Sequence, residues 1–213
     1  GGGGGGGYIL KKIPRQKTDK IVSGGGVNPF SDVDSKSSNF KAIQWAKENG
    51  IVKGYADGTF KPNQPINRVE FLKVIIEANK VEEGNYLFAD PGFTDVDKSQ
   101  WYWPYIQAGY TLTVFEGDAG KNTARPGYTV NRAEVLKMLF ELQSVSEKDK
   151  VKVSACNITY DDVEGADWFY KYVCKSDKYD LIDVTGTYFN PGKLSTRGEV
   201  TEVLYRLDKQ LNS

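Results

Sequence analysis

Histidine is absent from this chain of 213 residues. Because histidine is the commonest general base and metal ligand, its absence removes the usual solutions for acid–base catalysis and for transition-metal binding. The two cysteines, Cys156 and Cys174, cannot complete a cysteine-rich zinc site on their own. We therefore predict that the chain is not an enzyme, has no catalytic residues and holds neither a metal nor a cofactor.

Charge excess and long apolar runs are absent as well. Lysine and arginine number 28 together, and so do aspartate and glutamate, so the chain lacks the basic excess that is typical of nucleic-acid-binding proteins. No apolar run approaches the ~20 residues that a membrane-spanning helix needs. We predict no nucleic-acid partner and no membrane span.

The start of the chain has little that could enter a core. Residues 1–7 are all glycine, a lysine-rich stretch follows, and glycine also occupies residues 24–26. Glycine-rich tracts behave as flexible coil, so we expect residues 1–29 to form a linker. We also expect the chain to be a piece cut from a larger protein.

Two motifs recur three times along the remaining chain. An aromatic residue, any residue, Asp, Val and an acid occupy residues 30–34, 93–97 and 160–164, and Asn or Thr, Arg, any residue and Glu occupy 67–70, 131–134 and 196–199. The arginines of the second motif, Arg68, Arg132 and Arg197, are 64 and 65 residues apart. Repetition at a fixed period predicts an architecture of similar supersecondary units stacked together.

The second motif predicts the start of a helix, because Asn or Thr followed three residues later by Glu is a capping box. The expected caps are Glu70, Glu134 and Glu199. Each arginine then lies in the first helical turn, where the helix dipole disfavours a cation. We interpret this placement as an anion-binding site, in which free backbone N–H groups and the guanidinium would bind the anion together. Alternatively, each arginine forms an ion pair with an acidic residue of the adjacent repeat, for which Asp32, Asp95 and Asp162 are the obvious partners.

Hydrophobic spacing completes the predicted secondary structure. We expect helices over residues 38–49 and 68–79, 101–110 and 132–143, and 168–177 and 197–210. Gly50 follows the first of these as a left-handed cap. The rest is long loops with a few residues of strand. Because one helical pair cannot bury its apolar face alone, neighbouring repeats must cover it.

The fullest copy of the pattern matches a known family. After the first motif, repeat 1 has Ala-Ile-x-Trp-Ala at 42–46, Gly-Ile-Val-x-Gly-Tyr at 50–55, Asp-Gly-Thr-Phe-Lys-Pro at 57–62 and Ile-Asn-Arg-Val-Glu at 66–70. The chain resembles three tandem S-layer homology (SLH) domains of bacterial surface proteins. This resemblance implies an all-α fold of three helix-loop-helix repeats, residues 30–92, 93–159 and 160–213, arranged as a pseudo-threefold bundle with grooves between the repeats.

The resemblance also implies a function and a site. Such modules lie outside the cell, in the cell envelope or S-layer, and anchor a larger surface protein non-covalently to secondary cell-wall polysaccharide or a peptidoglycan-linked glycan. A common ligand is a pyruvate ketal on a terminal N-acetylmannosamine, whose carboxylate is bound by the arginine of the helix-opening motif. Aromatic faces would hold the sugar ring, and glycine would let the backbone approach it. The candidate residues are Arg68, Arg132, Arg197, Trp101, Trp168, Asp32, Asp95, Asp162 and Gly54.

The repeats differ at positions that this function would use. Trp101 and Trp168 precede the first helices of repeats 2 and 3, but Ser38 stands at that position in repeat 1, and the glycine-rich loop is incomplete in repeats 2 and 3. Loops 2 and 3 are therefore expected to bind more weakly or to be structural only. In an exported protein we expect Cys156 and Cys174 to form a disulfide rather than two buried thiols.

Two other functional classes remain as alternatives. The first is a structural, self-assembling module of a surface protein that binds no glycan. The second is a hydrolase, which would need a nucleophile–base set or a carboxylate pair, and the sequence offers no recognisable motif for one. The aspartates of the first motif lack the spacing of an EF-hand calcium loop, so turn formation explains them better.

Overall fold

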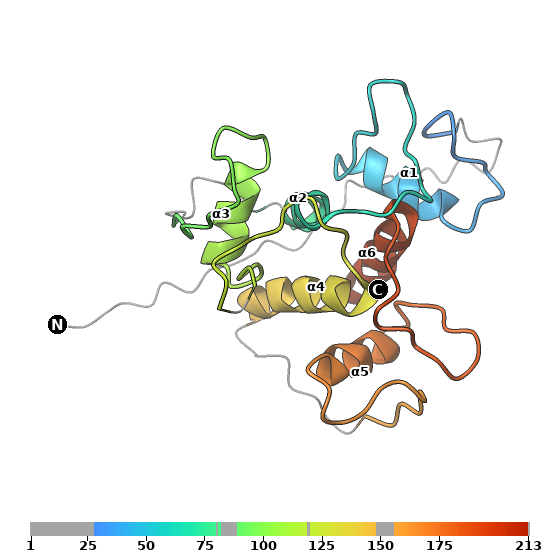
Figure 1. Ribbon diagram of the computed structural model, residues 1–213. Coiled ribbons are helices and arrows are strands. Elements are labelled where there is room, and N and C mark those ends of the chain that lie inside the picture. The colour runs from blue at the N-terminus through green and yellow to red at the C-terminus, as the bar shows by residue number, and fades with distance from the viewer. Residues whose placement is uncertain (1–27, 80, 82–88, 119, 148–155, 213) are drawn as a thin grey trace.

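The computed structural model describes residues 28–79, 81, 89–118, 120–147 and 156–212, and this part of the chain forms six helices and no named strand (Figure 1). The helices are α1 (Phe40–Glu48), α2 (Arg68–Ala78), α3 (Trp103–Thr111), α4 (Arg132–Glu147), α5 (Tyr170–Lys178) and α6 (Arg197–Asn212). The predicted all-α fold is confirmed. The linker expected over residues 1–29 lies outside the described residues, except for residues 28 and 29. None of the described helices is long and apolar enough to cross a bilayer.

The three capped helices, α2, α4 and α6, begin at the arginines, as predicted. In α2 the side-chain oxygen of Asn67 accepts a hydrogen bond from the backbone N–H of Glu70 (2.9 Å), and the Glu70 carboxylate accepts one from the N–H of Asn67 (3.0 Å). The same reciprocal pair caps α4 and α6. Each box satisfies two N–H groups that a helix leaves unpaired at its start, so the predicted capping role of the glutamates is confirmed.

The three shorter helices, α1, α3 and α5, begin two residues later than predicted, because turns precede them. Trp101 and Trp168 therefore lie in the turns before α3 and α5 and not in the helices. Pro104 occupies the first turn of α3, where its missing N–H costs no helical hydrogen bond. Gly50 follows α1 with φ +72°, which confirms the predicted left-handed cap.

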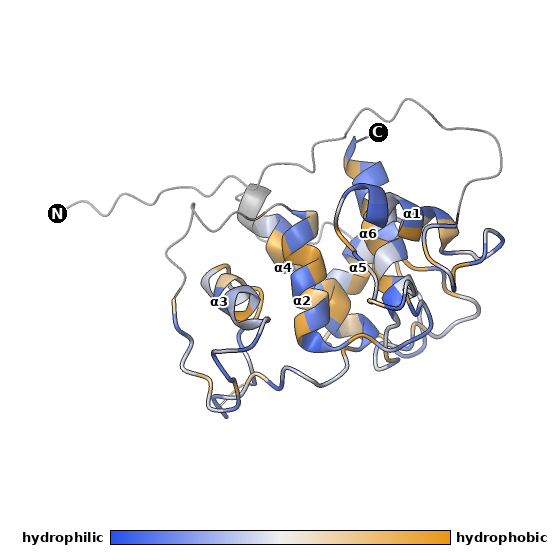
Figure 2. Cartoon of the chain, turned by 90° about the horizontal axis from the view of Figure 1, so that it is seen from above, coloured by the Kyte–Doolittle hydropathy of each residue, from blue (hydrophilic) through white to orange (hydrophobic). Residues whose placement is uncertain are grey.

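Helices pack between repeats rather than within them. α3 packs against α2 and α5 against α4, so the first helix of a repeat covers the capped helix of the repeat before it. α1 closes the ring on α6, where the rings of Trp45 and Tyr205 lie 5.6 Å apart. α2 also contacts α4, and Figure 2 shows the apolar residues of these two helices in the middle of the bundle. Neighbouring repeats therefore cover one another's apolar faces, as expected.

A triangle of backbone hydrogen bonds joins the three repeats at the centre. The N–H of Ile66 donates to the carbonyl of Ser195 (3.0 Å), Ser195 donates to Val130 (3.0 Å), and Val130 donates back to Ile66 (3.1 Å). All three residues are buried, and each directly precedes the cap of its helix. This cyclic pattern makes the bundle pseudo-threefold. The expected strand residues occur here only as isolated bridges between repeats.

A disulfide fastens the start of repeat 3. Cys156 is bonded to Cys174 of α5, with Cα atoms 5.6 Å apart, so the predicted disulfide is confirmed. The bond joins residues separated by 18 positions and ties α5 to the segment that precedes the first motif of repeat 3. Repeat 3 is thus tied covalently where the other repeats rely on packing alone.

Replacing both cysteines by serine is expected to lower the free energy of unfolding by about 3 kcal/mol, because a loop of this length loses the restraint on its unfolded state. Urea denaturation of the wild type and the double variant measures the difference. A reducing agent should shift the wild-type midpoint to that of the variant and leave the variant unchanged. Equal midpoints under oxidising conditions would show that the bond adds nothing to stability.

Candidate functional site

Three grooves lie between the repeats, and each is built from all three. Each contains the arginine of one repeat, the loop and capped helix of the next, and a residue that precedes the first helix of the third. Groove 1, about 190 Å³, is lined by residues 50–55, Glu70, Lys73, Val74, Glu77, Trp101 and Arg197. Groove 2, about 440 Å³, is lined by residues 114–118, Arg125, Glu134, Lys137, Met138, Trp168 and Arg68. Groove 3, about 180 Å³, is lined chiefly by residues 181–183, Glu199, Glu202, Arg206, Asn39 and Arg132.

Each arginine is held by a carbonyl of the following repeat. Arg197 Nε donates to the carbonyl of Phe60 (2.8 Å), and Arg68 Nε donates to that of Ala124 (3.0 Å). Arg132 donates in the same way through Nη1, to the equivalent carbonyl in repeat 3. The guanidinium groups also stack on aromatic rings, as Arg197 does at 4.8 Å from the centroid of Phe60. An arginine therefore belongs to the groove of the next repeat's loop and not to that of its own.

The three aspartates of the first motif hold the loop that supplies this carbonyl. Asp32 accepts hydrogen bonds from the backbone N–H groups of Phe60 and Lys61, one on each carboxylate oxygen, both at 2.7 Å. Asp95 and Asp162 make the same pair of bonds in repeats 2 and 3. The alternative of an ion pair with an acid of the adjacent repeat is confirmed for Arg68, whose partner is Glu134 at 3.5 Å. Within the described residues no ion pair joins an arginine of the motif to Asp32, Asp95 or Asp162, so these expected partners are wrong. Their contribution to ligand binding stays a prediction.

The backbone N–H groups at the helix starts are not free, so that prediction is wrong. Arg68 N–H donates to the carbonyl of Tyr128 (2.8 Å) and Val69 N–H to that of Pro126 (3.4 Å), while the capping box satisfies the next donor. The corresponding groups of α4 donate to repeat 3, and those of α6 donate to repeat 1. The amides that could bind an anion instead dock one repeat on the next. An anion in a groove would be met by side chains alone.

Gly54 is required by packing. It has φ +72°, and a Cβ at this position would lie 2.3 Å from the ring of Phe30 and 2.8 Å from the carbonyl oxygen of Thr59. Gly117 has the same close contact with Phe93 in repeat 2. The glycine that the sequence suggested for approach to a ligand is therefore needed first for the approach of an aromatic ring. It still lines groove 1.

The two tryptophans lie where the prediction needs them. Trp101 is 51% exposed at groove 1 and Trp168 is 54% exposed at groove 2. The Nζ of Lys73 lies 5.4 Å from the centroid of the Trp101 ring, so a cation and a flat apolar face are adjacent in groove 1. Groove 3 has Asn39 in place of an aromatic residue.

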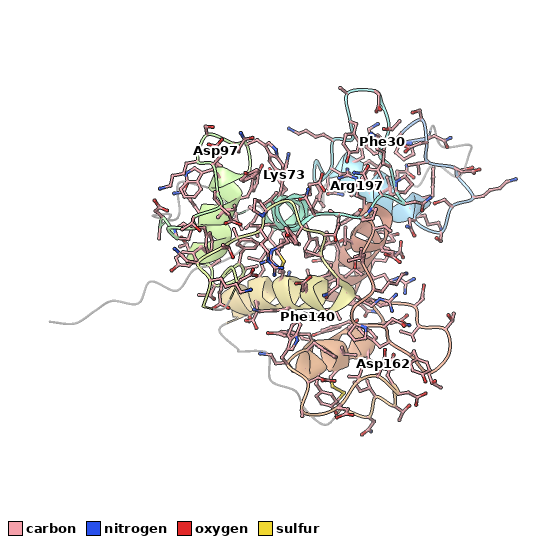
Figure 3. All side chains as sticks on the ribbon, in the orientation of Figure 1. Phe30, Lys73, Asp97, Phe140, Asp162 and Arg197 are labelled. Atoms are coloured by element: carbon pink, nitrogen blue, oxygen red, sulfur yellow. A yellow bond between two sulfur atoms is a disulfide. The ribbon has the colours of Figure 1, made fainter. Side chains whose placement is uncertain are left out.

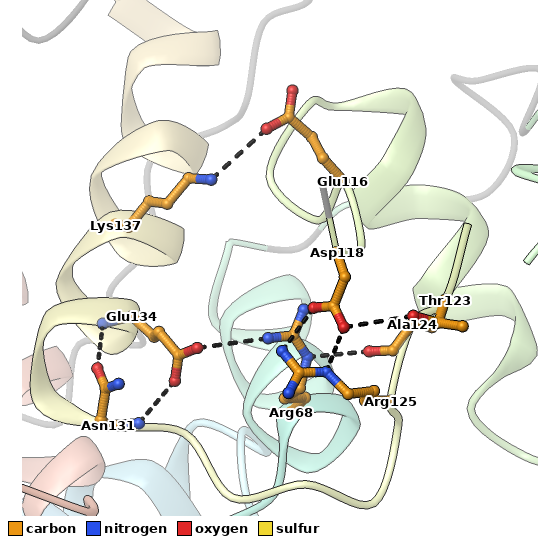
Figure 4. Close-up of polar contacts among 9 residues, drawn as sticks. All are labelled: Arg68, Glu116, Asp118, Thr123, Ala124, Arg125, Asn131, Glu134 and Lys137. Carbon is orange, nitrogen blue, oxygen red and sulfur yellow. Dashed lines mark hydrogen bonds and ion pairs between the residues drawn. The ribbon is translucent and has the colours of Figure 1, made fainter. Parts of the chain in front are cut away.

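In groove 2 every cation has an acidic partner (Figure 4). Arg68 Nη1 lies 3.5 Å from the Glu134 carboxylate, and Lys137 Nζ lies 3.5 Å from a carboxylate oxygen of Glu116. Arg125 forms an ion pair with Asp118, in which Nη2 donates a hydrogen bond to one carboxylate oxygen and Nε lies close to the other. Burial acts to raise the pKa of Asp118, but the Arg125 hydrogen bond and charge outweigh it and lower this pKa. Burial lowers the pKa of Arg68, against the attraction of Glu134.

In groove 3, acids of the same groove also neutralise a cation. Arg206 binds both carboxylate oxygens of Asp183, at 2.7 and 2.6 Å, and its Nε donates to Glu202 at 2.9 Å. These bonds raise the pKa of Arg206, with the hydrogen bond to Asp183 as the largest cause, and they lower the pKa of Asp183. Burial lowers the pKa of Arg132, the motif arginine of this groove. Its cations thus either lie in internal ion pairs or are partly withdrawn from solvent.

Groove 1 differs from both. Within the described part of the chain, Lys53, Lys73 and Arg197 have no ion-pair partner, and the terminal nitrogens of Arg197 have no hydrogen-bond partner. Two carboxylates also line the groove, but neither forms an ion pair within the described residues: Glu70 caps α2, and Glu77 accepts a hydrogen bond from the Tyr105 hydroxyl (2.6 Å). Figure 3 shows that two of the cations come from different helices, Lys73 from α2 and Arg197 from the start of α6.

Sequence reasoning missed the two lysines of groove 1. It distinguished the three sites by their tryptophan and glycine-rich loop, and considered only aromatic, glycine and aspartate residues beside the arginines. A signal was present in the alignment of the repeats, where Lys53 stands one residue before Gly54 while acids, Glu116 and Asp183, stand at the equivalent positions. Only the groove geometry shows that this position faces the cations of the neighbouring helix.

Comparison with known proteins finds relatives named as an S-layer protein and as glycan-degrading enzymes. It is 28% identical over 196 residues, 86% of its length, to the exoglucanase XynX of Acetivibrio thermocellus, and 25% identical over 185 residues, also 86% of its length, to the S-layer protein sap of Bacillus anthracis. It is 36% identical over 103 residues, 48% of its length, to the endo-1,4-beta-xylanase A of Thermoanaerobacterium saccharolyticum. The chain spans 17%, 22% and 8% of these three relatives.

A family model matches each repeat separately. The model for the S-layer homology domain matches residues 29–72, 92–136 and 159–201. Each matched segment contains one aromatic-x-Asp-Val motif and one capping box with its arginine. The chain belongs to the S-layer homology domain family and carries three such domains.

Proposed function

We propose that this chain is a non-covalent anchor that binds an acidic cell-wall polysaccharide in groove 1. The family and the S-layer relatives locate it outside the cell, at the cell envelope. The observation that carries the proposal is the state of Arg197: its Nε is fixed by the carbonyl of Phe60, and its terminal nitrogens are unpaired beside Lys53 and Lys73. A guanidinium held in this way presents a planar fork that a carboxylate matches bidentately.

The groove also fits the sugar that would carry this carboxylate. The exposed face of Trp101 offers the apolar surface on which a sugar ring packs through its C–H groups. Tyr55 also lines the groove, and its ring centroid lies 4.8 Å from the Arg197 guanidinium. A terminal N-acetylmannosamine with a pyruvate ketal carries both a sugar ring and a carboxylate, so we propose it as the ligand class.

The same comparison supports a proposal about the larger protein that this chain would serve. The chain covers less than a quarter of the length of the relatives named above, two of which are named as glycan-degrading enzymes and one as an S-layer protein. We propose that it anchors a larger surface protein whose activity, if it has one, lies outside these residues. The module itself is proposed to have no catalytic role, no cofactor and no nucleic-acid partner.

A second candidate function is a structural, self-assembling module. The observation that favours it is that grooves 2 and 3 satisfy their own charges, as a surface used only for packing would. In that case the repeats would contact other parts of the surface protein. Size-exclusion chromatography and wall binding on the same sample distinguish the two candidates.

Arg197→Ala is expected to weaken binding to cell-wall sacculi that carry their polysaccharide by about 30-fold, because a hydrogen bond to a charged group contributes about 2 kcal/mol. Co-sedimentation over a range of protein concentrations measures the change. Lys73→Ala should weaken binding as well, since Lys73 faces the same groove and has no ion-pair partner within the described residues. Thermal unfolding of each variant checks that the fold is kept.

The matched control is Lys137→Ala. Lys137 occupies on α4 the position that Lys73 occupies on α2, but it is already paired with Glu116, so its removal should leave wall binding unchanged. Equal binding by wild type and Arg197→Ala would refute the site. Equal binding of the wild type to sacculi with and without polysaccharide would refute the ligand class and favour the structural alternative.

A further inference from the structure

One loop position carries a different charge in each groove. Lys53, Glu116 and Asp183 stand at equivalent places, each at the end of the segment that returns from the first helix of its repeat. In groove 2 the Glu116 carboxylate lies 3.5 Å from Lys137. In groove 3 Asp183 binds Arg206 through both oxygens. In both grooves the loop acid neutralises a cation of the capped helix.

Groove 1 cannot make this pair. Its loop residue is Lys53, so Lys73, the counterpart of Lys137, has no acid opposite it within the described residues. Glu77, an acid of α2 that also lines this groove, accepts a hydrogen bond from the hydroxyl of Tyr105. A single charge in the loop thus determines whether the cations of a groove face an internal partner or remain available.

We infer that this loop position selects the groove that takes the anionic ligand, so that the chain has one open groove and two that its own acids close. This inference rests on the proposed function. An acid in the loop acts twice, because it neutralises the lysine or arginine that a ligand carboxylate needs, and its own charge repels that carboxylate. Lysine at the same position leaves the other cation of the groove without this acidic partner, does not repel the ligand carboxylate and attracts it instead.

The two closed grooves differ in how readily they could be opened. Groove 2 retains Trp168, an arginine held by a loop carbonyl and a lysine on its capped helix, and Glu116 is the acid that pairs with this lysine. The Glu116 side chain in this pair is 62% exposed, and its replacement should not disturb the core. Groove 3 lacks the aromatic residue and has a second acid, Glu202, on Arg206. Groove 2 is therefore the one that a single substitution should convert.

The test is isothermal titration calorimetry with the methyl glycoside of N-acetylmannosamine bearing a pyruvate ketal, and with the same glycoside lacking the ketal. The wild type should bind one ketal-bearing molecule per chain. Lys53→Glu should weaken this binding by at least about tenfold, since it replaces an attraction by an internal pair and a repulsion. Glu116→Lys should add a second site of comparable affinity. Lys41→Glu, which makes the same charge change on an exposed residue of α1 away from the grooves, should bind as the wild type does.

The outcomes separate the inference from the function beneath it. If the wild type binds the ketal-bearing glycoside but Lys53→Glu is unaffected, or if folded Glu116→Lys still binds one molecule, the loop position does not select the groove and the inference is wrong. Two or three molecules bound by the wild type would also overturn it, while the proposed function would stand. No binding of the glycoside by the wild type would instead refute the proposed ligand itself.

Discussion

Deleting α6 is expected to unfold the whole bundle and not only repeat 3. α6 covers α1 of the first repeat, and its first residues donate hydrogen bonds to repeat 1, from the N–H groups of Arg197 and Gly198 to the carbonyls of Gln64 and Pro62. Its buried side chains include Val200, Val203, Leu204 and Leu207. Each of these contributes about 2 kcal/mol by burial, and their sum approaches the whole stability of a domain, about 5–15 kcal/mol.

Far-UV circular dichroism and thermal unfolding of a chain that ends at Thr196 measure this effect. The expected result is a loss of the cooperative transition and of most helical signal, including the signal of α1 to α3. A chain that ends at Leu211 is the control, since it keeps the apolar residues of α6 that are buried in the core or packed against it. A cooperative transition in the longer deletion, near the wild-type temperature, would show that repeats 1 and 2 are stable without the ring.

Gly54→Ala is expected to destabilise the protein by about 3 kcal/mol, because two costs add. A non-glycine residue in the left-handed region costs about 1–2 kcal/mol, and forcing a methyl group into a filled site costs about 1–3 kcal/mol more. Here the added Cβ would lie 2.3 Å from the Phe30 ring, which is stacked on Phe60 and is held on its other face by Lys47. Urea denaturation gives the change in the free energy of unfolding.

Gly50→Ala is the matched control for this substitution. Gly50 has the same φ of +72°, but a Cβ there would have no atom within 4 Å. Its replacement should therefore cost only the backbone term, about 1–2 kcal/mol. Equal losses for the two variants would mean that Phe30 moves aside at no cost. Groove 1 includes both residues, so a displaced Phe30 ring should also weaken wall binding in Gly54→Ala but not in Gly50→Ala.

The helices could be predicted because their signals are local. Asn67 and Glu70 are three residues apart, so the capping box is visible in the sequence, and all three boxes form as expected. The predicted start of α3 was two residues too early, because Trp101 lies close to the helix but in a turn. The repeated motifs also sufficed to identify the family and the three domains.

The site was harder to predict because its contacts cross between repeats. Asp32 binds backbone 28 residues away, and Arg197 reaches a carbonyl that precedes it by 137 residues. No local pattern indicates that the amides of a helix start are used for docking, or that an arginine serves the loop of the next repeat. The contribution of Lys73 depends on the absence of an acid opposite it, which is a property of the groove and not of any motif.

The central triangle limits how many domains such a protein can usefully contain. Ile66, Val130 and Ser195 each give one amide hydrogen and each accept one, so three members close the cycle with nothing left over. A chain with two members would bury an unmatched donor and an unmatched acceptor on the axis, and a fourth would find no vacant place. Gene duplication that lengthens such an anchor should therefore succeed in multiples of three.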